Sequence, residues 1–206
     1  MLADSFGRIA TDLRVSLTDR CNLRCAYCMP PEGLDWLPSP ELLTDDEVAR
    51  LVRVAVELLG IREVRFTGGE PLLRRGLARI VARTAELRPR PEISLTTNGI
   101  GLTRTAGPLR ASGLDRINVS LDTLRPETFR KLARRDRLPD VLDGLAAAAE
   151  AGLGVVEIAH QHGVDLDRGQ AAAAVLPGPR LRAAVHRADA AGRAARLEAR
   201  RDGDRG

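Results

Sequence analysis

Segments typical of strands and helices alternate along the first 158 residues, at a spacing of roughly 25–35 residues. Alternating or continuous apolar residues indicate strands at 12–18, 63–67, 92–96, 116–121 and 155–158. Helical periodicity occupies the stretches between them, at 45–59, 77–87, 126–133 and 141–151, with one short helix before residue 116. This order predicts an α/β fold of βαβ units around a parallel sheet. Right-handed crossovers curl such a series toward a partial (β/α) barrel whose post-strand loops share one rim.

The first helix has specific boundary residues. Thr44 and Glu47 form a capping box, in which Thr44 is the N-cap and the Glu47 side chain reaches back to it. Gly60 ends the helix, because glycine readily adopts the left-handed conformation of a C-cap.

The composition changes abruptly after residue 158. Residues 159–206 contain 13 Ala and nine Arg, and no Ser, Thr, Asn, Lys, Ile or aromatic residue. We therefore expect two parts: a core at 1–158 and an anomalous Ala/Arg-rich tail at 159–206 that is disordered or out of frame. The barrel would then be incomplete at its C-terminal side.

Charge and hydropathy exclude several classes of protein. The tail, with nine Arg against six acidic residues, supplies +3 of the formal charge of +4, so the core has no basic stripe for nucleic acid. Aromatic residues are only 2% of the chain, which argues against a base-stacking surface. The sequence has neither a secretory signal nor an apolar run of about 20 residues, so we expect a cytoplasmic protein without a membrane partner.

The three cysteines, Cys21, Cys25 and Cys28, have the spacing C-x3-C-x2-C. An odd number within eight residues is not a disulfide framework. Three thiolates on one loop can hold three irons of a [4Fe–4S] cluster and leave the fourth iron open. A zinc site is the alternative, but structural zinc takes four ligands, and every histidine lies in the tail.

This motif resembles that of the radical S-adenosylmethionine (SAM) superfamily. The resemblance implies that SAM binds the open iron and is cleaved by one electron to a 5′-deoxyadenosyl radical. It also implies cofactor contacts by Tyr27, by Gly69 in Gly68-Gly69-Glu70-Pro71, and by Ser120. Taken alone, the glycine pair is an ordinary turn, and Ser120 or Asp122 is a helix cap.

A more specific resemblance covers roughly residues 5–154. Six motifs occur in order: DLR at 12–14, TDRC at 18–21, YCMP at 27–30, RFTGGEPL at 65–72, LTTNG at 95–99 and NVSLD at 118–122. Together they look like the GTP 3′,8-cyclase family, lyases that convert GTP to 3′,8-cyclo-7,8-dihydro-GTP in the first step of molybdopterin biosynthesis. In that family Arg14, Arg65 and Thr96 match GTP contacts, and guanidinium groups suit a triphosphate.

The resemblance also implies partners: an electron donor such as a flavodoxin or ferredoxin, and the downstream cyclic pyranopterin monophosphate synthase. A homodimer stays open, because the sequence does not specify the oligomeric state.

The resemblance ends near residue 158. The family's second cluster site is absent, and Glu157 stands where the family has a GTP-contacting lysine. Freely chosen codons for residues 183–198, read one base later, encode LRFIEQMPLDAQHGW, which resembles the family's own segment. We therefore hypothesise a frameshift upstream of Ala183 and expect this chain to be inactive in cyclisation. The alternative is a non-catalytic remnant or a module that binds a cluster or zinc.

Overall fold

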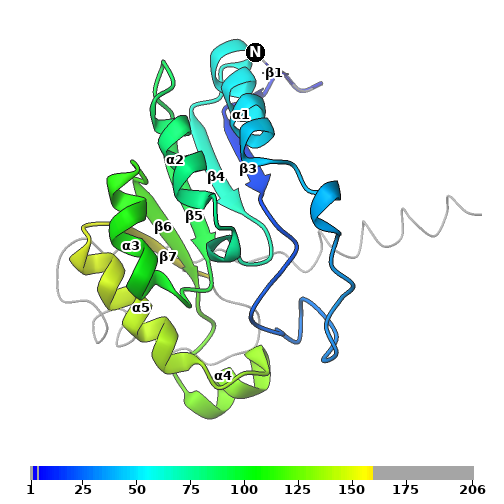
Figure 1. The fold of residues 1–206 in the computed structure, drawn as a ribbon, viewed down its shortest axis with the longest axis vertical. Helices are drawn as coiled ribbons and strands as arrows, with labels where there is room; N and C mark the ends of the chain where they lie inside the picture. Colours follow the sequence, from blue (N-terminus) through cyan, green and yellow to red (C-terminus); the bar gives the residue numbers. More distant parts are fainter. Residues whose placement is uncertain (1, 4, 160–206) are drawn as a thin grey trace, which may run out of the picture.

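Five parallel strands form the central sheet of the computed structural model, which describes residues 2–3 and 5–159. They lie in sequential order: β3 (Asp12–Ser16), β4 (Glu63–Thr67), β5 (Glu92–Thr97), β6 (Arg116–Ser120) and β7 (Gly154–Ala159). All five predicted strands are confirmed, and so is the α/β class (Figure 1). A short antiparallel pair, β1 (Leu2–Ala3) with β2 (Ile9–Ala10), precedes the sheet and was not expected.

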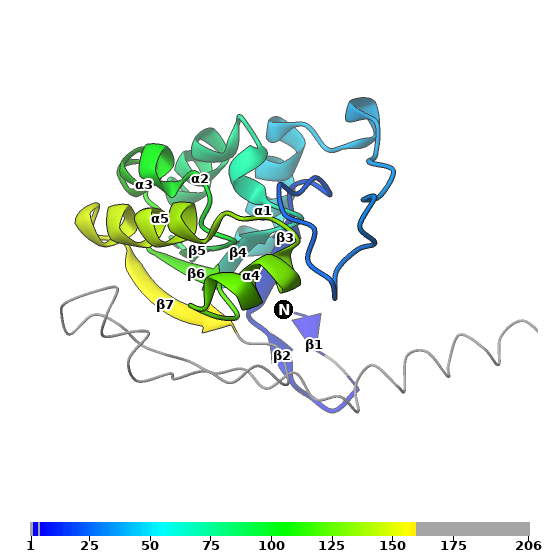
Figure 2. The ribbon, with the colours of Figure 1, turned by 90° about the horizontal axis from the view of Figure 1, so that it is seen from below.

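The main helices cover one face of this sheet (Figure 2). They are α1 (Asp45–Leu59), α2 (Leu77–Ala85), α3 (Leu102–Ala111) and α5 (Leu138–Glu150), with α1 against α2 and α3 against α5. Helix α4 (Pro126–Ala133) follows β6, and single 3-10 turns lie at η1 (Ser39–Glu41) and η2 (Pro71–Leu73). The predicted capping box at Thr44 and left-handed cap at Gly60 are both present. Among the described residues, none of the helices has the length and apolarity that crossing a bilayer requires.

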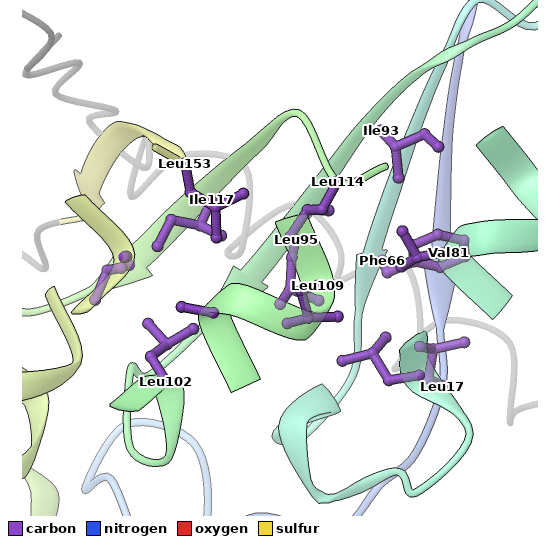
Figure 3. Packing of buried hydrophobic residues seen from close by; sticks show 14 of the residues in the cluster. Leu17, Phe66, Val81, Ile93, Leu95, Leu102, Leu109, Leu114, Ile117 and Leu153 are labelled. Carbon is purple, nitrogen blue, oxygen red and sulfur yellow. The ribbon is translucent and has the colours of Figure 1, made fainter. Parts of the chain in front are cut away.

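The hydrophobic core lies between the sheet and these helices (Figure 3). Phe66 on β4, Leu95 on β5 and Ile117 on β6 are completely buried there. Each such side chain contributes roughly 1.5–3 kcal/mol by leaving water. Because side chains alternate along a strand, the neighbours of these residues point to the opposite face.

The opposite face of the sheet is polar, and we call it the polar face. Strand register places its residues in rows: Arg14, Arg65, Ser94 and Arg116 form one row, and Ser16, Thr67, Thr96 and Asn118 form the next toward the carboxyl ends. A molecule bound to this face would therefore contact arginines toward the amino ends of the strands and small polar side chains toward their carboxyl ends.

The expected tail lies almost entirely outside the described residues. Ala159 ends β7, and residues 160–206 are not described. The division at residue 158 and the frameshift hypothesis therefore stay predictions.

Candidate active site at the carboxyl ends of the strands

The cysteine loop, residues 18–29, follows β3 and is docked on the end of α4. Within it, the amides of Cys28 and Met29 both donate to the Cys25 carbonyl, at 2.9 and 3.1 Å. The amides of Arg24 and Ala26 donate to the last carbonyls of α4, at 3.0 and 2.8 Å. Those carbonyls have no partner inside a helix, so the helix end is a natural anchor for the loop.

The thiols of the cysteine loop lie at the boundary between core and surface. Cys21 and Cys25 are half-buried and pack on the hydrophobic core, whereas Cys28 is exposed. Burial raises the pKa of Cys25 to about 11, and the neighbouring Cys28 and Cys21 thiols add to the effect. Burial likewise raises the pKa of Cys21. These groups are therefore protonated at neutral pH and would release protons when a metal binds.

The donor set fits a [4Fe–4S] cluster by its chemistry. Thiolates are the ligands that iron–sulfur clusters take, and three of them leave one iron open. Within the described part of the chain, no three His, Cys, Asp or Glu side chains are arranged as a ready-made metal site.

The glycine pair after β4 packs against the cysteine loop. A Cβ added to Gly68 would lie 2.3 Å from the Thr18 carbonyl oxygen, and one added to Gly69 would lie 2.3 Å from that of Arg20. The Gly69 amide donates to Thr18 at 2.7 Å. Without a side chain, glycine lets another group approach the backbone closely, and the approach that the structure shows is by the chain's own backbone. The contact of Gly69 with SAM stays a prediction.

Glu70 is the buried centre of this region. Its carboxylate is fully enclosed and accepts from the Leu72 amide at 3.0 Å, the Thr97 hydroxyl at 2.7 Å and the Asn98 amide at 2.7 Å. Burial raises the pKa of Glu70, and the three donors oppose that shift. The carboxylate thereby joins the loop after β4 to the end of β5.

Two further hydrogen bonds connect the strand ends with the cysteine loop. The Asn98 side-chain amide donates to Asn22 Oδ1 at 2.6 Å and lies 3.9 Å from Cys21 Sγ. The Tyr27 hydroxyl donates to Asp122 Oδ2 at 2.7 Å, just beyond β6. Burial, followed by this bond, raises the pKa of Tyr27.

The structure separates the predicted site residues into two groups. The cysteines, Tyr27, Gly69 and Ser120 belong to the carboxyl ends of the strands and the loops that follow them. Arg14, Arg65 and Thr96 lie on the polar face, one or two rows nearer the amino ends of the strands than Ser120. Sequence reasoning missed Glu70, Asn98 and the end of α4, because their partners are distant in sequence. Glu70 and Asn98 lie inside two of the quoted motifs, whereas the end of α4 lies in none of them.

Replacing Gly69 by alanine should damage the site through the cysteine loop. We expect G69A to lower the free energy of unfolding by about 1–3 kcal/mol, because its Cβ meets backbone that cannot turn aside. The matched control is G107A in α3, where a Cβ meets nothing within 4 Å and alanine favours the helix. Urea unfolding of both variants makes the comparison; equal stability of G69A and the parent chain would contradict this packing.

Known proteins that resemble this chain agree with the fold and the cysteine loop described above. A family model for the Radical SAM superfamily matches residues 15–173. A GTP 3′,8-cyclase of Streptomyces coelicolor is 70% identical over 158 residues, which is 77% of this chain and 46% of that protein. One from Mycobacterium sp. (strain KMS) is 66% identical over 157 residues, 76% of this chain and 45% of that protein. The chain thus spans less than half the length of these curated relatives.

Solved structures share the fold at low sequence identity. SuiB of Streptococcus suis, in its SAM-bound crystal structure, has a TM-score of 0.62 at 20% identity and covers 77% of this chain and 35% of its own. Methylornithine synthase has a TM-score of 0.62 at 18% identity and covers 86% of this chain and 54% of its own. The family match, the cysteine loop and the parallel sheet agree: the chain belongs to the radical SAM superfamily, which uses a [4Fe–4S] cluster and SAM.

Proposed function

We propose that this chain carries the radical-generating and phosphate-binding part of a GTP 3′,8-cyclase. The whole enzyme would convert GTP to 3′,8-cyclo-7,8-dihydro-GTP, the first step of molybdopterin biosynthesis. Identity of 70% to a GTP 3′,8-cyclase supports this assignment. Because the chain spans 46% of that relative, we propose that these residues alone do not complete the cyclisation.

The proposal that GTP is the substrate rests on two arginines that have no partner among the described residues. Arg14 and Arg65 lie directly opposite each other on β3 and β4 of the polar face. Among the described residues, neither guanidinium makes a hydrogen bond or ion pair. Like charges opposite each other on a sheet are destabilising, so an anion between them would relieve the repulsion. A triphosphate supplies that charge and the oxygens for bidentate bonds.

The third arginine of the same row is already paired. Arg116 on β6 bonds to Glu92 and lies 3.2 Å from Glu63 Oε2. Its charge is therefore neutralised by the protein itself. This contrast supports a phosphate site at the β3–β4 side of the row.

At the carboxyl ends, we propose that Cys21, Cys25 and Cys28 bind the cluster and that Tyr27, Gly69 and Ser120 surround SAM. When bound, cluster and cofactor would supply reductive cleavage and hydrogen-atom abstraction. The chain's own part is to hold the cysteine loop in place through α4 and through Asn98. Thr96, one row above the arginines, lies between the two regions.

The triphosphate site can be tested without any cofactor. We expect R14A and R65A each to weaken GTP binding about 10- to 100-fold, since a hydrogen bond to a charged group contributes about 1.5–3 kcal/mol. The control is R53A, which removes the same charge from the exposed side of α1. Isothermal titration with GTP gives the affinities. If all three variants match the parent chain, the phosphate site is wrong.

The cluster can be tested by anaerobic reconstitution with iron and sulfide. We expect a [4Fe–4S] cluster whose electron paramagnetic resonance signal, once reduced, changes when SAM is added, with release of 5′-deoxyadenosine. Serine at any of the three cysteines should abolish it, because the loop has no spare thiol. Zinc uptake without a cluster would instead favour the alternative, a non-catalytic binding module. Cyclisation of GTP by this chain would refute the proposed need for the missing part.

The proposal also includes the cell compartment, the partner proteins and the reading frame of the tail. We propose that the protein is cytoplasmic, where its three thiols would stay reduced. A flavodoxin or ferredoxin would be its electron donor, and cyclic pyranopterin monophosphate synthase would be the next enzyme. We further propose that residues 159–206 are read from a shifted frame. Resequencing the locus decides this: a single-base difference should restore the family's segment, and an intact gene encoding this tail would reject the frameshift.

A further inference from the structure

The carboxamide of Asn118 on β6 is buried and has no hydrogen-bond partner among the described residues. The residue is 3% exposed, and within that part of the chain neither Nδ2 nor Oδ1 makes a hydrogen bond. A buried polar side chain is almost always bonded, because leaving it unsatisfied is costly. A ligand that bonds to both atoms would account for this arrangement.

The sheet is irregular at the same residue. Ile117 pairs with Val155, but Asn118 pairs with Glu157, so the register between β6 and β7 skips one residue, Val156. Such bulges occur preferentially beside active sites, where they change the direction of a side chain. The unpartnered amide and the bulge are separate observations at one position.

Thr96 on β5 lies next to Asn118 in register, on the same face. Its hydroxyl is likewise buried and has no hydrogen-bond partner in the part of the chain that the structure describes. Adjacent strands are about 4.8 Å apart, so the two side chains can bind one small group together. Their combined capacity is a donor and an acceptor from the amide and a hydroxyl that does either.

The position of this pair matches one part of a nucleotide. Arg65 lies on β4, beside β5, one row toward the amino ends, and Arg14 lies one strand further. From Asn118 the two arginines are therefore about 7 Å away along the strands and about 10 and 14 Å away across them. Ser120 lies one row toward the carboxyl ends, two residues before Asp122, to which Tyr27 of the cysteine loop donates. An extended triphosphate that reaches the arginine side chains can span this distance, which leaves its sugar at Asn118 and Thr96.

The chemistry of the carboxamide also favours the ribose over the guanine base as its ligand. A guanine edge is typically bound by arginine, whereas a carboxamide matches an adenine edge. A ribose diol offers two hydroxyls that can both accept from Nδ2 and donate to Oδ1. Resting on the GTP site proposed above, we propose that Asn118, with Thr96, binds the ribose 2′- and 3′-hydroxyls and makes the site specific for ribonucleotides.

The test compares the binding of GTP, 2′-deoxyGTP and inorganic triphosphate by isothermal titration, using the whole chain. The parent chain should bind GTP about tenfold more tightly than 2′-deoxyGTP, because the lost hydroxyl leaves the amide unpaired. N118L, of similar shape, should bind the two nucleotides equally and bind triphosphate like the parent. N118L should also resist urea at least as well as the parent, since it removes an unsatisfied polar group.

Two further variants complete the experiment. N118D keeps oxygen acceptors for the hydroxyls and should retain the preference for GTP. T84V removes a buried hydroxyl on α2, far from the polar face, and should change no affinity. Equal binding of GTP and 2′-deoxyGTP by the parent, or an undiminished preference in N118L, would overturn the role of Asn118 alone. A parent chain that binds neither triphosphate nor GTP would overturn the proposed function and this inference with it.

Discussion

The arrangement of the site depends on the hydrogen bonds of the Glu70 carboxylate. It is completely buried and is bonded to two backbone amides and one hydroxyl from η2 and from the end of β5. Its loop in turn lies against residues 18–20, where only glycine leaves room for the approach. Loss of this carboxylate would leave buried donors unsatisfied on two strand ends at once. The ends of β4 and β5 therefore help to position the cysteine loop, together with the end of α4.

The two faces of the sheet have separate tasks. The face under the helices consists of completely buried apolar side chains and supplies most of the stability. The polar face carries two arginines, an amide and a hydroxyl that have no partner among the described residues. Groups that cost stability in the free protein are typical of binding sites, because a ligand satisfies them.

Much of the fold follows from local pattern. Alternating or continuous apolar residues predicted all five strands of the sheet, and the capping box at Thr44 predicted the start of α1. The cysteine spacing predicted the cluster site, and its family is confirmed by the match over residues 15–173. The glycine pair also packs against the backbone of residues 18–20, which the sequence did not indicate because it shows that a close approach is allowed but not what approaches. The sequence analysis noted Asn118 only as the first residue of the NVSLD motif at 118–122.

The sequence alone determined the order of strands and helices, the three thiols of the cluster site and the family. Each of these depends on residues close together in the chain, through periodicity, capping or ligand spacing. Only the tertiary structure decided that the end of α4 anchors the cysteine loop, that Glu70 joins β4 to β5, and that Asn118 and Thr96 lack partners. Those facts depend on which distant residues share a face or a hydrogen bond. That is set by strand register and helix packing, which no local pattern encodes.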